Sequence, residues 1–304
     1  MTGISNPTGP AAGPVVNALS VDVEDYYHVS AFSGVIRRKD WGHYPPRVED
    51  NTRRVLDLFA VAGTTATFFM LGCVAERHPR LVRDIVADGH ELASHGYAHH
   101  RVWELSPASF ISDIDRTRRL LEDIAGVPVL GYRAPSFSIN HETWWAYEAL
   151  EAAGYRYSSS IHPIRHDHYG MPDAPRFPFR PAGIRMIEIP VGTVERSGRR
   201  WSCAGGGFFR ILPYAWSSGG IRRVNGREDR PVTFYFHPWE IDTDQPRIAA
   251  APLRSRLRHY TNLEYMETKL RRLFADFAWM RMDAVYGIDA ADLAAIPSVP
   301  AVAT

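Results

Sequence analysis

The chain of 304 residues has an ordinary globular composition, with 45% hydrophobic and 23% charged residues and a formal net charge of +1. This length can bury one large core or two smaller ones. The balanced charge provides no global field that would attract nucleic acid, so no nucleic-acid partner is expected. The two cysteines, Cys73 and Cys203, are far apart and exclude a disulfide scaffold.

The N-terminal residues 1–16 are rich in glycine, proline and small side chains. They lack the basic and apolar regions of a signal peptide, so we expect a flexible leader. No window has the apolar length of a membrane span, so no transmembrane segment is expected. The sequence therefore predicts a soluble, cytoplasmic protein.

Strand-like and helix-like segments alternate along the rest of the chain. The predicted strands are residues 19–23, 64–71, 91–94, 129–132, 155–157, 186–189, 232–236 and 277–280. The predicted helices are residues 48–62, 73–88 with a restart at Pro79, a helix between the Ser106 cap and Gly126, one from Asn140 to Ala153, and a late one containing residues 263–274. About seven alternations predict an α/β fold, either a barrel or an open doubly wound sheet. The longer, irregular residues 158–230 are expected to lie above the strand ends and to shape a site.

Acidic residues follow the first predicted strand. On that strand Asp22 and Glu24 face the same way, whereas Asp25 diverges unless the strand has already turned. Two carboxylates on one face can divide their roles, one binding a metal and the other remaining free as a base. An ordinary acidic turn is the alternative interpretation of this segment alone.

Two histidines four residues apart follow the third predicted strand. The imidazoles of His95 and His99 can turn toward one point and share a divalent metal ion. Gly96 argues against a continuous helix, so the pair is expected on a turn that leaves a strand. The adjacent His100 is expected to point elsewhere, as a surface histidine.

Two further strand ends carry polar groups. Arg133 follows the strand at 129–132 and could hold a carboxylate in its ionised form. His237 follows the apolar strand at 232–236 and suits a general acid near neutral pH, and Trp239 suits the face of a sugar. Enzymes of the α/β class build active sites at the carboxyl ends of their strands. Together, these groups predict metal-assisted attack of water on an amide or ester.

The ordered segments SVDVED, TFFMLG, GHELASHGYAHH, GYRAPSFS and YFHPWE resemble the NodB-homology polysaccharide deacetylases, carbohydrate esterase family four. The resemblance extends over about residues 18–285. The segments VDVEDYYHV, SSIHPIRHDHYGMP, GGGFFRILPY, FYFHPWEID and RLRHYTNLE are similar to the exosortase-associated (XrtA, PEP-CTERM locus) subgroup. The family resemblance implies a distorted (β/α)7 barrel, TIM-barrel-like, with a bound divalent metal ion, most simply Zn²⁺.

The resemblance also implies roles for individual residues. It assigns the general base to Asp22, the metal ligands to Glu24, His95 and His99, the orientation of Asp22 to Arg133, an oxyanion-binding backbone N–H to Ser136, the general acid to His237, and a wall of the acyl or sugar pocket to Trp239. Asp25 remains the alternative metal ligand, because the commonest family motif has two adjacent aspartates. Ser158 stands where relatives often carry an aspartate, which leaves the tuning of His237 open.

The function implied is that of a hydrolase acting on carbon–nitrogen bonds, which removes N-acetyl groups from hexosamines of a bacterial exopolysaccharide or its precursor. Its partner would be an N-acetylated polysaccharide or oligosaccharide. The alternatives are an allantoinase-like hydrolase of a small cyclic amide and a non-catalytic carbohydrate-binding protein. Residues 17–285 are expected to form one catalytic domain with a subgroup-specific part from about residue 231, and residues 286–304 a C-terminal tail.

Overall fold

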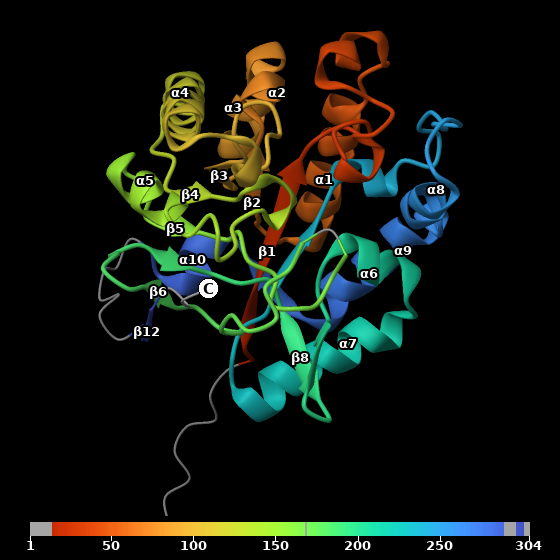
Figure 1. The fold of residues 1–304 in the computed structure, drawn as a ribbon. Coiled ribbons are helices and arrows are strands. Elements are labelled where there is room, and N and C mark those ends of the chain that lie inside the picture. The colour runs from red at the N-terminus through yellow and green to blue at the C-terminus, as the bar shows by residue number, and fades with distance from the viewer. Residues whose placement is uncertain (1–13, 168, 289–295, 301–304) are drawn as a thin grey trace, which may run out of the picture.

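The computed structural model describes residues 14–167, 169–288 and 296–300, and its centre is a curled parallel sheet (Figure 1). Among these residues, seven parallel strands follow the order β10-β1-β2-β3-β4-β5-β7, and β11 pairs beside β1. The strands are β1 (Val16–Val23), β2 (Thr67–Met70), β3 (Glu91–Ser94), β4 (Gly131–Tyr132), β5 (Tyr157–Ser158), β7 (Ile187–Glu188), β10 (Thr233–Phe236) and β11 (Ala278–Met280). The prediction of a distorted seven-stranded barrel is confirmed.

The barrel is not fully closed between its first and last strands. Within the described residues no strand ladder joins β7 to β10. Instead, the chain leaving β7 runs beside β10, and the N–H of Gly192 donates to the carbonyl of Thr233 at 2.9 Å. The sheet therefore curls into a barrel in which individual hydrogen bonds, rather than a strand ladder, join the β7 side to β10.

Helices cover the outside of the sheet (Figure 1). They are α1 (Val48–Ala62), α2 (Gly72–Arg77), α3 (Pro79–Ala87), α4 (Pro107–Ala125), α5 (Ala146–Ala152), α6 (Gly206–Ile211), α7 (Tyr214–Arg223), α8 (Leu253–Tyr260), α9 (Leu263–Asp276) and α10 (Met282–Tyr286). The bounds of α1 and the predicted Ser106 cap of α4 are confirmed.

The predicted helix from Asn140 to Ala153 is wrong at its start. The carboxamide oxygen of Asn140 accepts the N–H groups of Glu142 and Thr143, which closes a local turn. Such side-chain bonds compete with helix formation. The regular helix α5 begins six residues later, at Ala146.

Side chains alternate between the two faces of the strands. Leu19, Val21 and Val23 of β1 pack in the large core between the sheet and the helices. Ala18 of β1, Phe69 of β2, Ala93 of β3, Tyr157 of β5 and Ile187 of β7 form a separate cluster that fills the barrel interior. Because this cluster fills the interior, the polar groups at the carboxyl ends of the strands lie above a packed apolar floor.

Two small sheets lie outside the barrel. β6 (Arg180–Pro181) pairs with β12 (Ser298–Val299), and β8 (Thr193–Arg196) forms a hairpin with β9 (Arg199–Ser202). β12 lies within the segment expected to be a C-terminal tail, and most of the expected leader lies outside the described residues.

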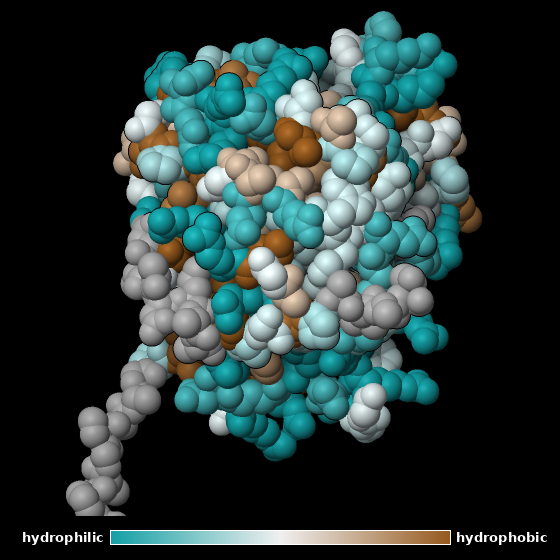
Figure 2. All heavy atoms as spheres, turned by 60° about the vertical axis from the view of Figure 1, so that its left-hand side comes forward, coloured by the Kyte–Doolittle hydropathy of each residue, from teal (hydrophilic) through white to brown (hydrophobic). Residues whose placement is uncertain are grey.

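Figure 2 shows the side of the molecule that carries α4 and α5. On this face the apolar groups are scattered rather than continuous. Hydrophilic residues dominate that face, and single apolar residues lie between them. In the part of the chain that the structure describes, no helix is long and apolar enough to cross a membrane.

Candidate active site

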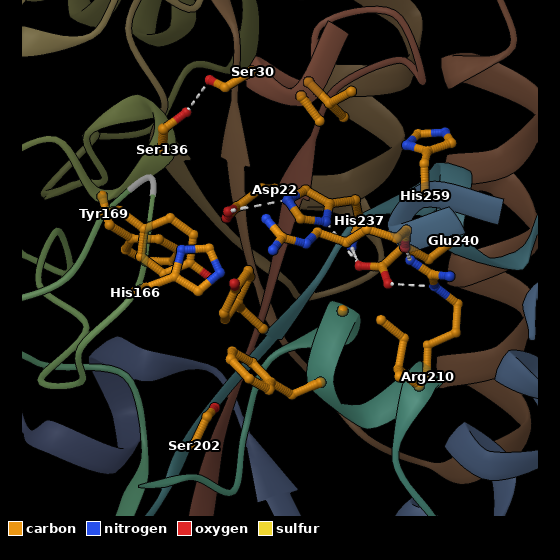
Figure 3. Close-up of a pocket in the computed structure, with 18 of the residues that line it drawn as sticks. Asp22, Ser30, Ser136, His166, Tyr169, Ser202, Arg210, His237, Glu240 and His259 are labelled. Carbon is orange, nitrogen blue, oxygen red and sulfur yellow. Dashed lines mark hydrogen bonds and ion pairs between the residues drawn. The ribbon is translucent and has the colours of Figure 1, made fainter. Parts of the chain in front are cut away.

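The carboxyl ends of four strands bring the predicted site residues together. Asp22 lies at the end of β1, His95 follows β3, Arg133 follows β4, and His237 follows β10. Parallel neighbours end at the same edge of a sheet, which is why groups more than 200 residues apart in sequence meet here. Asp22, His95 and His237 line a pocket of about 670 Å³ (Figure 3).

Glu24, His95 and His99 form a buried cluster with the composition of a metal site. One ligand atom from each residue lies within 4.8 Å of the others. Oε2 of Glu24 is buried without a hydrogen-bond partner, although it lies 2.9 Å from Nε2 of His99. A buried carboxylate oxygen without a hydrogen bond is costly, and a cation would satisfy it. The donor set of two imidazoles and a carboxylate fits a divalent metal such as zinc.

The ring of His95 is held in the tautomer that a ligand needs. Its Nδ1 lies 2.8 Å from the carbonyl of Arg133, which can only accept, so Nδ1 carries the proton and Nε2 is left for the metal. Burial lowers the pKa of His95 to about 4, so the imidazole is neutral at physiological pH. For Glu24, burial opposes ionisation, but the nearby imidazoles of His99 and His237 outweigh it and lower the pKa. Glu24 and His95 thus have the protonation states that metal ligands require.

The alternative ligand Asp25 serves the backbone instead. Its Oδ2 accepts the N–H groups of Arg47 (2.8 Å) and Val48 (3.1 Å) at the start of α1, and its Oδ1 accepts the N–H of Tyr26 (3.0 Å). These are donors that the first turn of a helix leaves unpaired. Both oxygens are therefore committed to backbone, and the geometry favours Glu24 over Asp25 as the ligand. His100 lies outside the cluster, as predicted, but it is half-buried rather than a surface histidine.

Asp22 is fixed by a fully buried arginine. Nη1 of Arg133 donates to Oδ1 of Asp22 at 2.6 Å and to the hydroxyl of Ser20 at 2.9 Å. The remaining guanidinium donors bind the carbonyl and the hydroxyl of Ser159, and the cation lies 4.0 Å from the ring centre of Phe69. This network immobilises one carboxylate oxygen and leaves Oδ2 facing the pocket, 3.9 Å from Nε2 of His237.

His237 lies between three carboxylates. Its Nε2 is 3.2 Å from Oε1 of Glu24, and its Nδ1 is 2.8 Å from Oε1 of Glu240. Burial alone would lower the pKa of His237, but Glu24, Glu240 and Asp22 together raise it to about 9. The imidazolium form is therefore favoured at neutral pH, as a general acid requires.

Glu240 is in turn anchored by Arg210. Its Oε2 accepts from Nε of Arg210 at 3.2 Å, and both side chains are almost completely buried. Figure 3 shows Asp22, His237 and Glu240 following one another across the site, with Arg210 reaching Glu240 from below. Gly206 is required beside this pair, because a Cβ there would lie only 1.9 Å from Oε1 of Glu240.

Sequence reasoning missed Glu240 and Arg210. The open question was which carboxylate replaces the aspartate absent at Ser158, whose hydroxyl instead donates to Ser160 at 2.7 Å. Glu240 lies three residues after His237, in the segment already used for the resemblance, and that spacing was a usable signal. Arg210 gave none, because only the fold brings it to Glu240.

Trp239 and Ser136 line the pocket, as predicted. The indole of Trp239 stacks between the rings of His237 (5.1 Å between centroids) and His259 (4.2 Å). Ser136 has a positive φ of 56°, and its hydroxyl lies 2.5 Å from that of Ser30. A serine in this left-handed conformation is strained, and such strain is often stored where a backbone group must face a ligand.

Two family models match adjacent parts of the chain. Residues 40–158 match the polysaccharide deacetylase model, and residues 159–287 match a domain of unknown function, DUF3473. The first range contains His95, His99 and Arg133, and the second contains His237, Glu240 and Arg210. The strand β1 precedes both ranges and pairs with β2 of the first and β10 of the second, so both ranges and β1 build one barrel and one pocket.

Curated relatives match about a third of the chain. The peptidoglycan deacetylase-like protein FGM2 of Gibberella zeae is 32% identical over 108 residues, which are 36% of this chain and 31% of that protein. A peptidoglycan-N-acetylglucosamine deacetylase of Bacillus cereus is 31% identical over 98 residues, 32% of this chain and 36% of that protein. The chain thus spans about a third of the length of these relatives.

A solved structure matches the whole fold. The crystal structure of a presumed polysaccharide deacetylase from Mycobacterium smegmatis superimposes with a TM-score of 0.60 at 20% identity, covering 100% of this chain and 98% of that one. Residues 40–158 therefore resemble polysaccharide deacetylases, and the solved structure shows that the fold is shared over the whole chain.

Proposed function

We propose that this protein is a metal-dependent N-deacetylase that releases acetate from hexosamines of a bacterial exopolysaccharide or its precursor. One observation carries the proposal. The buried Glu24–His95–His99 cluster lies beside Asp22 and His237, which approach within 3.9 Å of each other in a single pocket. The proposal includes zinc as the metal, a single catalytic domain over residues 17–285, the exosortase-associated subgroup and a cytoplasmic location.

Asp22 is suited to accept the proton of the attacking water. Its Oδ1 is occupied by Arg133, so only Oδ2 is free to take a proton on the pocket side. A divalent ion held by Glu24, His95 and His99 would polarise the acetamide carbonyl and make the water more acidic.

His237 is suited to protonate the departing amine. Glu240 holds the imidazole through Nδ1, which leaves Nε2 facing the pocket. Attack of water on the acetamide carbon forms one C–O bond, and the C–N bond then breaks as the nitrogen gains a proton from Nε2. The products are acetate and a free amino sugar. The backbone N–H of Ser136 would contribute to stabilising the oxyanion.

The pocket favours a sugar substrate over a small cyclic amide. Its volume of about 670 Å³ and its many aromatic lining residues exceed what a ring of a few atoms needs. The aromatic side chains include Phe208, Trp201, Trp216, Tyr169 and Trp239. Their apolar faces with polar edges suit pyranose rings.

Replacement of Asp22 by asparagine tests the proposal. Acetate release from N-acetylated oligosaccharides should fall at least about 10²-fold, because proton transfer is lost while shape is kept. Metal content, measured by elemental analysis, should remain near one per chain in Asp22→Asn and disappear in His95→Ala. Undiminished acetate release by Asp22→Asn with the metal present would refute the assignment. Ring opening of allantoin without acetate release would favour the cyclic-amide alternative, and glycan binding without any turnover would favour a non-catalytic protein.

A further inference from the structure

The β8–β9 hairpin lies outside the barrel and reaches the edge of the pocket. Its turn residues Ser197 and Gly198 both have positive φ, at 50° and 69°. Two positive φ values are typical of the tight turns that match the twist of paired strands. The hairpin is therefore a defined element, and the register places Arg196 directly opposite Arg199.

Side chains on the hairpin divide between its two faces. Arg196, Arg199 and Trp201 share one face, because alternate residues of a strand point the same way and paired residues share a face. On the other face, Arg200 donates to the carbonyl of Pro172 at 2.7 Å and so anchors the hairpin to the body of the protein. On the first face, Val194 packs into the core, whereas Arg196 and Arg199 near the turn are exposed and left for contact with something else.

Trp201 connects this face to the candidate active site. It is 43% exposed and meets Trp216 of α7 edge-to-face, with 5.9 Å between ring centres. The indole N–H of Trp216 donates to the carbonyl of Ser202 at 3.0 Å, which fixes the pair. Both tryptophans line the central pocket and also a second, open cavity whose other lining residues are Arg196, Ser197 and Arg199. Ser202, at the lower edge of Figure 3, marks the end of the pocket nearest the hairpin.

The two arginines of this cavity lack a compensating charge. Like charges directly opposite each other in a hairpin are destabilising. Among the described residues, no carboxylate lies within ion-pair distance of Arg196 or Arg199, and no acidic residue lines the cavity. Neighbouring arginines do have partners, as Arg176 does in Glu228. A negative group bound between Arg196 and Arg199 would relieve their repulsion.

We propose that the Trp201–Trp216 pair and the arginines Arg196 and Arg199 form a distal subsite for an acidic sugar unit of the substrate chain. The proposal deepens the proposed function, on which it rests. A chain whose acetylated unit lies at Asp22 and His237 would pass the tryptophan pair and place a carboxylate-bearing sugar between the arginines. The enzyme would then prefer long, acidic glycans over short or neutral ones.

Two series of oligosaccharides test this subsite. Chito-oligosaccharides are neutral, whereas hyaluronan oligosaccharides alternate N-acetylglucosamine with glucuronic acid. The double variant Arg196→Gln/Arg199→Gln should raise KM for the hyaluronan hexasaccharide about fivefold at low salt, and leave chitobiose kinetics unchanged. Trp201→Ala should raise KM for the hexasaccharides of both series about tenfold. The matched control Arg116→Gln/Arg119→Gln, on α4, should change neither.

Binding separates this proposal from the proposed function. Tryptophan fluorescence of Asp22→Asn, titrated with each hexasaccharide, reports the subsite without turnover. Preference for the acidic chain that the arginine variant abolishes supports the subsite, even if no probe releases acetate and the proposed function fails. Equal binding of both chains, unchanged by the arginine variant, would overturn it. Displacement by inorganic phosphate but not by sodium glucuronate would also overturn it, since the cavity would then bind phosphate rather than a sugar acid.

Discussion

Replacing Glu240 by glutamine should weaken the general acid without removing it. Glutamine keeps the size and one acceptor oxygen, so the 2.8 Å contact with Nδ1 of His237 can persist as a neutral hydrogen bond. The negative charge that stabilises the imidazolium is lost. Arg210 loses its carboxylate partner but keeps its bonds to the carbonyls of Arg258 and Thr261.

The expected size follows from the burial of the pair. Glu240 is fully buried, and hydrogen bonds to charged groups contribute about 1.5–3 kcal/mol. Each unit of pKa corresponds to about 1.4 kcal/mol, so the pKa of His237 should fall by about one to two units from its value near 9. Because the pKa of His237 is raised, its imidazolium form persists up to the pH that equals this pKa and is lost above it. The alkaline limb of kcat should therefore move to lower pH by a similar interval.

Acetate release measured from pH 5 to 10, with metal content determined for every variant, checks this prediction. Asp242→Asn is the matched control. Its carboxylate is also buried and binds Arg47 and Asn51, but within the described residues no hydrogen bond or ion pair joins it to His237. That variant should lose stability and keep the wild-type pH profile. An unchanged alkaline limb in Glu240→Gln, at wild-type metal content, would refute the role of Glu240.

Three further predictions concern the metal, the base and the core. Glu24→Ala should lose the metal in elemental analysis, whereas Asp25→Ala should retain it. Asp25→Ala should instead lower the free energy of unfolding in urea by about 0.5–2 kcal/mol, because the start of α1 loses its capping carboxylate. Metal loss in Asp25→Ala alone would reverse the choice of ligand. Arg133→Met should lower the free energy of unfolding by about 3–5 kcal/mol, because Asp22 is left as a buried, unpaired charge. As a control, Arg53→Met breaks the half-exposed Arg53–Asp84 pair and should lower the free energy of unfolding by at most about 1 kcal/mol. Equal losses in the two variants would contradict this prediction. Burial, with Asp283 nearby, raises the pKa of Glu91 from 4.5 to about 8, so the folded state holds an extra proton and stability should fall as the pH rises from about 4.5 to 8. In urea unfolding measured across this pH range, Glu91→Gln should show a smaller fall in stability than the wild type. Equal falls in the two proteins would contradict the prediction.

Periodicity predicted the barrel well because its strands are buried on both faces and bounded by clear helix ends. The run at residues 64–71 contains β2, and Gly63 ends α1 in the left-handed conformation that glycine favours. The start of α5 was wrong for a local reason. Asparagine is favoured both at the start of helices and in turns. Only the structure shows that Asn140 forms a turn, which ends after Thr143.

The metal-side residues were predictable because each lies at a strand end or within five residues of one. Strand alternation already placed Asp22 and Glu24 together, but it could not decide between Glu24 and Asp25. That choice depends on α1, whose first N–H groups capture Asp25 from 22 residues away in sequence. The Arg210–Glu240 pair depends on contact between α6 and the segment after β10, for which no local pattern exists.

The residues that match the domain of unknown function belong to the same sheet and line the same pocket as the residues before them. Their strand β10 runs parallel to β1 in register from Ala18 to Val21, immediately before Asp22. If residues 159–287 were removed, β1 would lose this partner, and the pocket would lose His237 with both residues that hold it. The metal ligands alone could polarise an amide, but the departing nitrogen would lack a proton donor. The proposed reaction therefore requires both matched ranges, and the distal subsite on the β8–β9 hairpin would make the second range the one that selects the glycan.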